Sequence, residues 1–185
     1  SATYPQQIKG LARRYLVDSQ MVKVDATHDA TTIAQSFYEV DKPQKRFDAL
    51  QLLLLHHRPQ STLVFCNTKR ETQSVADKLA KRGFSVAALH GDLEQKDRDI
   101  ALIRFGNKSI SILVATDVAA RGLDIIDLDA VINFDIAQDA EIHLHRIGRT
   151  GRAGSKGVAY SLFSEQEKNR VARFDTEVDP IRHKE

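Results

Sequence analysis

The sequence predicts an α/β fold in which a mostly parallel β-sheet is covered by helices on both faces. Short apolar runs alternate along the chain with segments of helical periodicity, and this alternation favours right-handed crossovers between parallel strands. Several of the runs are apolar on both faces of the predicted strand, which is typical of strands buried on both sides of a sheet. With 42% hydrophobic residues, the 185-residue chain can bury the core of such a domain.

Six segments have the length and composition of strands. They comprise residues 35–40, 61–67, 85–90, 109–116, 128–135 and 157–163. The clearest helix between them covers residues 69–82, because Thr68 and Glu71 form a capping box before it and Gly83 ends it. Two more helices are indicated by the stripe of Arg98, Ala101, Leu102 and Phe105 and, behind the N-cap Asp139, by that of Ala140, Leu144 and Ile147.

Residues 1–30 lie outside this alternation. They predict a helix over residues 5–17 and a short apolar segment at 21–24, followed by a polar linker over residues 25–32. The compact domain is therefore expected to begin near Ile33. Because the chain does not begin with Met, we expect it to be a piece of a longer protein.

The bulk composition narrows the class of protein. With 27 Lys and Arg against 25 Asp and Glu, the charge balance does not by itself indicate a nucleic-acid binder. The longest aliphatic run, Leu52 to Leu55, is far too short to cross a membrane, and the first residues have no targeting pattern. A single cysteine, Cys66, cannot form an internal disulfide, so a reducing compartment, the cytoplasm, is expected.

Polar residues follow four of the predicted strands. In open parallel sheets, ligands bind beyond the carboxyl ends of the strands. Here these ends carry Asn67 and Thr68, His90 to Asp92, Thr116 and Asp117, and Asp135. Each has a structural alternative, because Thr68 and Asp117 could only cap helices, and Gly91 and Asp92 could only serve a turn. As a set, they indicate a binding edge.

Arg146, Arg149 and Arg152 lie three residues apart in a glycine-rich segment without carboxylates. They fit either a solvated basic face or a phosphate site, because the planar guanidinium fork matches phosphate oxygens. The glycines at 148, 151 and 154 do not have the spacing of a dinucleotide-binding loop and follow a helix instead of a strand, which argues against a nicotinamide cofactor.

Two features needed for ATP hydrolysis are absent from the sequence. It contains no G-x-x-x-x-G-K-[ST] phosphate loop and no acidic pair after a strand to position magnesium. The acidic stretches at 92–99 and 124–129 lack the calcium-loop pattern, so no metal site is expected. This chain alone should not hydrolyse ATP.

Five ordered segments resemble the second RecA-like domain of DEAD-box RNA helicases. They are "LVFCNT", "LHGDLEQKDRD", "VATDVAARGLDI", "VINFDIA" and "HRIGRTGRAG". The opening "SAT" resembles the motif that closes the nucleotide chemistry of the first domain, and the resemblance extends to about residue 165. His145, where many DNA-directed relatives carry Gln, indicates the RNA branch.

The resemblance implies a three-layer RecA-like α/β/α domain over residues 31–175. Residues 1–30 would then be the end of the first RecA-like domain and the interdomain linker, and residues 176–185 a tail. ATP with Mg²⁺ would be bound mainly by a first RecA-like domain outside this sequence, which is the implied protein partner.

The resemblance also implies roles for individual residues. Arg149 and Arg152 would reach the γ-phosphate as arginine fingers. Asp124 would accept a hydrogen bond from the ATP ribose, and Gly122 would belong to the same nucleotide-binding set. His145, Arg146 and Arg121 would couple the cleft to the rest of the site, although Arg146 alone is equally compatible with packing at a helix end.

A separate set would contact the phosphates and sugars of one RNA strand with little base preference. This set consists of Asn67, Thr68, Gly91, Arg98 and Thr116. A non-catalytic RNA-binding module and a DNA translocase domain remain as alternatives. A pure binder has no use for γ-phosphate fingers, which favours the helicase.

Overall fold

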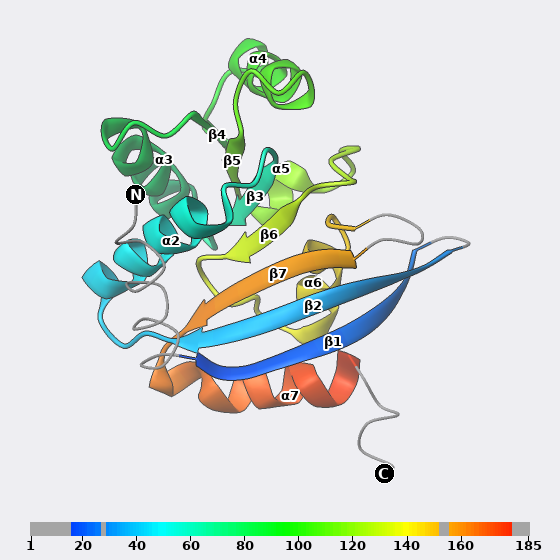
Figure 1. Ribbon diagram of the computed structural model, residues 1–185. Helices are drawn as coiled ribbons and strands as arrows, with labels where there is room; N and C mark the ends of the chain where they lie inside the picture. Colours follow the sequence, from blue (N-terminus) through cyan, green and yellow to red (C-terminus); the bar gives the residue numbers. More distant parts are fainter. Residues whose placement is uncertain (1–15, 27–28, 152–155, 179–185) are drawn as a thin grey trace.

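The computed structural model describes residues 16–26, 29–151 and 156–178. Seven strands form one sheet in the order β1-β2-β7-β6-β3-β5-β4 (Figure 1). All neighbouring strands are parallel except β1 and β2, which form an antiparallel pair at one edge. The predicted mostly parallel α/β sheet is confirmed.

The strands span β1 Leu16–Ala26, β2 Asp29–Glu39, β3 Thr62–Phe65, β4 Val86–Leu89, β5 Ile112–Ala115, β6 Ala130–Asn133 and β7 Lys156–Phe163. The helices span α2 Pro43–His57, α3 Lys69–Lys81, α4 Gln95–Gly106, α5 Asp117–Ala120, α6 Ala140–Ile147 and α7 Lys168–Val178, with a 3₁₀ turn at Glu165–Glu167.

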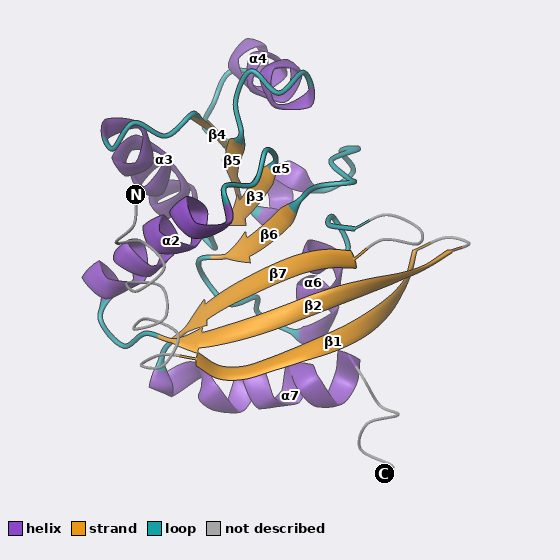
Figure 2. Ribbon diagram, in the orientation of Figure 1, coloured by secondary structure: helices purple, strands orange, loops and turns teal. Residues whose placement is uncertain are grey.

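Helices cover both faces of the sheet (Figure 2). Successive side chains of a strand point to opposite faces, and in β3 Val64 packs into the core beneath α2 and α3. Its neighbours Leu63 and Phe65 join the core on the other face, with residues of α4 and α5. Further along that face, α6 and α7 pack on β2 and β7 around Phe37 and Phe163. The domain therefore has three layers.

Helix starts follow the predicted caps. The Thr68 hydroxyl accepts a hydrogen bond from the Glu71 amide at 3.1 Å, and the Asp139 carboxylate accepts one from the Ile142 amide at 2.9 Å. Gly83, with φ of +89°, follows the end of α3 as expected. The helices α2 and α7 and the single-turn helix α5 were not predicted. In α2, the unbroken Leu52–Leu55 run hides the helical period.

The expectation for the N-terminal segment needs correction. Residues 16 and 17, expected to end a helix, belong to β1, and the rest of that helix lies outside the described residues. The expected linker contributes residues 25–26 to β1 and 29–32 to β2. Because this segment is polar, it has no apolar pattern that would predict strands. Its strands are defined by the pairing of β1 with β2 and of β2 with β7.

Within the described ranges, no helix has the length and hydropathy needed to cross a membrane. The same residues contain no group of three or more His, Cys, Asp or Glu side chains suited to hold a metal ion.

Candidate functional site

The polar ends of four strands lie along one edge of the sheet. Strands β6, β3, β5 and β4 are neighbours in that order and run in the same direction. The residues that follow them therefore gather at their shared carboxyl edge, as predicted. Of these residues, Asn67 and Thr68 are exposed, whereas His90 and Thr116 are buried.

Arg146, in the last turn of α6, lies beneath this edge with a side chain that is 1% exposed. Its Nε and Nη2 each donate to one carboxylate oxygen of Asp117 at 2.7 Å. Nη2 also donates to Asn67 Oδ1, and Nη1 to the backbone oxygen of Asp135, both at 2.7 Å. Arg146 thus joins the segments that follow β3, β5 and β6.

This network continues outward through Asp135. Its carboxylate accepts from the backbone N–H of Asn67 at 2.9 Å and from Arg46 Nη1 of α2 at 3.0 Å. Arg46 in turn lies 3.6 Å from Glu167. Because a buried charge is costly unless it is paired and hydrogen-bonded, these partners offset the cost of burying the Arg146 guanidinium.

A pocket of about 520 Å³ opens beside Arg146. It lies between the loop that follows α5 and the exposed side of α6. Its lining includes five residues of the predicted ATP and coupling sets, namely Arg121, Gly122, His145, Arg146 and Arg149. Gly122 has φ of +77°, a conformation that favours glycine and turns the loop sharply there.

Arg149 follows α6 and reaches across to this loop. Its Nη1 donates to the backbone oxygens of Leu123 at 2.9 Å and Ile125 at 3.3 Å, and its Nη2 donates to that of Ala120 at 3.0 Å. Partial burial lowers the pKa of Arg149 from its usual value, and the nearby carboxylates of Asp117 and Asp124 oppose that shift. Arg149 and the Asp124 loop are thus in direct contact.

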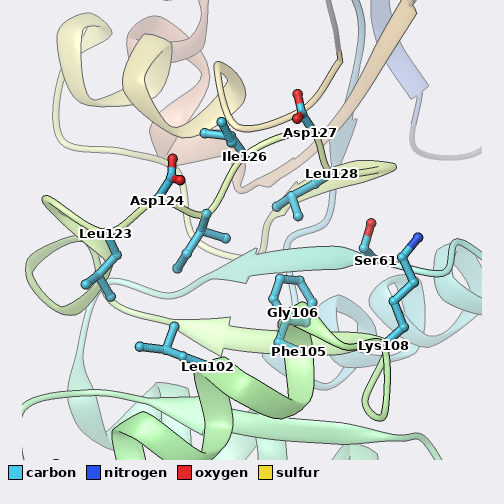
Figure 3. A pocket seen from close by; sticks show the side chains of 11 residues that line it. Ser61, Leu102, Phe105, Gly106, Lys108, Leu123, Asp124, Ile126, Asp127 and Leu128 are labelled. Carbon is cyan, nitrogen blue, oxygen red and sulfur yellow. The ribbon is translucent and has the colours of Figure 1, made fainter.

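Asp124 lies at one end of a second pocket, of about 360 Å³, between α4 and the loop of residues 123–128. Figure 3 shows that the carboxylates of Asp124 and Asp127 point away from the apolar side chains of Leu102 and Phe105. The exposed Asp124 carboxylate is therefore available to a ligand that approaches from outside the domain.

The predicted RNA-contacting residues have local roles as well. Thr68 and Thr116 cap α3 and α5 through their hydroxyls. Arg98 donates to the backbone oxygens of Gly91 at 3.1 Å and Leu93 at 3.3 Å, which holds the turn after β4. All five lie around the carboxyl ends of β3, β4 and β5.

Arg152 lies outside the described residues. The turn that leads to it is well anchored, because the Thr150 hydroxyl donates to the Leu128 backbone oxygen at 2.7 Å and accepts from the Val158 amide at 3.2 Å.

Partners of the buried arginine network that the sequence did not predict include Arg46 and Asn133. Arg46 belongs to the unpredicted α2, and Asn133 Oδ1 lies 3.4 Å from Arg146 Nη1 while its amide donates to Ser161 at 2.9 Å. An asparagine inside the apolar strand of residues 130–133 is the signal that could have identified one of them, because a buried amide requires polar partners.

The fold and this edge define the second, C-terminal RecA-like domain of DEAD-box helicases. The family model of the helicase conserved C-terminal domain matches residues 45–154, and the chain belongs to this family. Over 171 residues it is 49% identical to the ATP-dependent RNA helicase DbpA of Escherichia coli K12, covering 92% of this chain and 37% of that helicase.

Solved structures agree with this assignment. A DEAD box protein from Methanococcus jannaschii matches with a TM-score of 0.73 and 41% identity, over 97% of this chain and 48% of that one. Dbp5 of S. cerevisiae, bound to RNA and ADP BeF3, matches with a TM-score of 0.70 and 32% identity, over 76% and 38% of the two chains. The chain spans little more than a third of the length of the curated relatives it matches.

Proposed function

We propose that this domain is one half of an ATP-dependent RNA helicase. It supplies Arg149 and Arg152 to the γ-phosphate of an ATP bound on a first RecA-like domain, while Asp124 accepts a hydrogen bond from the ribose. The observation that carries the proposal is the contact between Arg149 and the Asp124 loop beside an open pocket. The residue that binds the ribose and the residue that binds the phosphate can therefore contact the same nucleotide.

The relatives support the chemistry. DbpA is an ATP-dependent RNA helicase, and the similar Dbp5 structure holds RNA and ADP BeF3. In other nucleotide hydrolases an arginine finger contributes about 10³ to 10⁵ in rate, or roughly 4 to 7 kcal/mol of transition-state stabilisation. A contribution of that size far exceeds that of a surface ion pair.

RNA binds, in this proposal, along the carboxyl edge through Asn67, Thr68, Gly91, Arg98 and Thr116. The buried network joins the two ligand sites, because Arg146 contacts Asn67 on one side and Asp117 on the other. ATP and RNA both favour closure of the two domains, so each should tighten the binding of the other. The closed pair holds a bent single strand and excludes a straight duplex, which opens base pairs locally.

The proposal has further aspects. Mg²⁺ is held by the first domain and the nucleotide. His145, Arg146 and Arg121 couple the two halves. The likeness to DbpA leads us to propose ribosomal RNA and ribosome assembly as the biological setting, and the single buried Cys66 fits the cytoplasm.

The test is to join this chain to a first RecA-like domain and measure ATP turnover. We expect no turnover by the chain alone, and turnover that rises with added RNA in the joined protein. RNA-stimulated turnover by the chain alone, or none in a joined protein that is folded and binds ATP, would refute the proposal. Equal stimulation by single-stranded DNA would favour a DNA translocase, and RNA binding without any turnover would favour a non-catalytic RNA-binding module.

A further inference from the structure

Arg149 uses only part of its hydrogen-bonding capacity inside the domain. A guanidinium group carries five N–H donors in a fixed plane. Nη1 and Nη2 together make three hydrogen bonds to the backbone oxygens of Ala120, Leu123 and Ile125. The Nε–H lies on the edge of the guanidinium away from Nη1, and in the described part of the chain no residue accepts from it.

Apart from the packing of Leu123 and Ile125 against the core, the loop that Arg149 holds has few other contacts in the described residues. The backbone N–H of Arg121 donates to the Asp117 backbone oxygen at 2.9 Å, and that of Leu123 to the Ala120 backbone oxygen at 3.2 Å. Gly122, between them, is exposed and has a positive φ, so the backbone itself does not favour one conformation there. Asp124 follows directly and is exposed.

We propose that Arg149 is a positioning residue for the ribose site as well as a ligand of the γ-phosphate. One edge of its guanidinium fixes the loop that presents Asp124, and the other edge remains available to bind phosphate without releasing the loop. This inference rests on the proposed function, and it adds that Arg149 contributes to the binding of nucleotides that have no γ-phosphate.

Lysine cannot replace arginine in this role. Its ammonium is a compact charge on a flexible stem, whereas three carbonyl oxygens of one loop require donors spread over a rigid plane. Charge alone would be sufficient for attraction to phosphate but not for holding the loop. The two substitutions Arg149→Ala and Arg149→Lys therefore have the same predicted effect on the loop.

Hydrogen exchange in the 185-residue chain, without nucleotide, tests the positioning role directly. We expect the amides of Arg121 and Leu123 to exchange about tenfold faster or more in both variants, because local opening becomes easier. Arg173→Ala, which removes an exposed arginine of α7, serves as the control and should leave exchange unchanged. Unchanged exchange at both amides in Arg149→Lys, which retains the fold most readily, would overturn the inference.

ADP affinity in the joined two-domain protein separates the inference from the proposed function. If Arg149 only touched the γ-phosphate, Arg149→Ala would leave ADP affinity unchanged. We expect it to weaken ADP binding about as much as Asp124→Ala does, with little further loss in the double variant. If Arg149→Ala leaves ADP affinity unchanged while Asp124→Ala lowers it, the positioning role is refuted and the proposed function is not. Unchanged affinity in Asp124→Ala instead refutes the ribose contact of the proposed function, and the exchange experiment still decides the positioning role.

Discussion

At the scale of single residues, His143 is the group whose burial has the clearest consequence. It is fully buried in α6, stacked between the rings of Phe37 and Phe174 at centroid distances of 5.8 and 4.8 Å. Its Nε2 lies 2.7 Å from Gln35 Oε1 and donates to it, while Nδ1 has no partner among the described residues. Burial, reinforced by the charge of Arg146, lowers the pKa of His143 to about 3.

A histidine with a lowered pKa makes stability depend on pH. Below pH about 6.5 the unfolded chain binds a proton that the folded chain excludes, so the stabilisation is complete above that pH and is lost as pH falls toward 3. Each pH unit in this window should cost about 1.4 kcal/mol. Urea unfolding of the wild type and of His143→Phe at several pH values gives, for each protein, the slope of the free energy of unfolding against pH. The wild type should have the steeper slope. Equal slopes between pH 6 and 4.5 would contradict a neutral buried His143.

At the scale of elements, β7 packs closely against the turn at Thr150 and Gly151, directly after Arg149. A Cβ at Gly157 would lie 2.9 Å from Thr150 Cγ2 and 3.0 Å from the Gly151 nitrogen. Gly157→Ala should therefore displace this turn and lower the free energy of unfolding by about 1–3 kcal/mol. Gly106→Ala is the matched control, because a Cβ there meets nothing within 4 Å and its helical position tolerates alanine. Chemical unfolding of both variants is the measurement, and equal stability would contradict the close packing.

Elements also show how far the sequence predicts the structure. The capped helices α3 and α6 and the apolar strands β3, β5 and β6 were predicted because local chemistry and tertiary packing agree there. The strand β1 and the helix α2 were not, since a polar ladder and an unbroken leucine run give no clear period. The same limit applies to the site. The edge was predictable from strand order, whereas the partners of Arg146 come from segments up to 79 residues away.

At the scale of the whole molecule, the proposed function gives this domain half of a nucleotide site. The sheet collects the polar strand ends at one edge, the buried Arg146 network holds these ends together, and the pocket beside them is open. The sequence contains arginines suited to phosphate but no phosphate-binding loop. The proposed function therefore requires a second domain that brings the nucleotide to Arg149 and Arg152.

The most direct measurement of this claim is the turnover number of the joined two-domain protein with saturating ATP and RNA. Replacing Arg152 by alanine should lower kcat at least about tenfold, because a transition-state donor is lost while RNA binding through the other edge residues is retained. Arg173→Ala, on the exposed side of α7, should leave kcat unchanged. An undiminished kcat in Arg152→Ala would contradict the supply of an arginine finger by this domain.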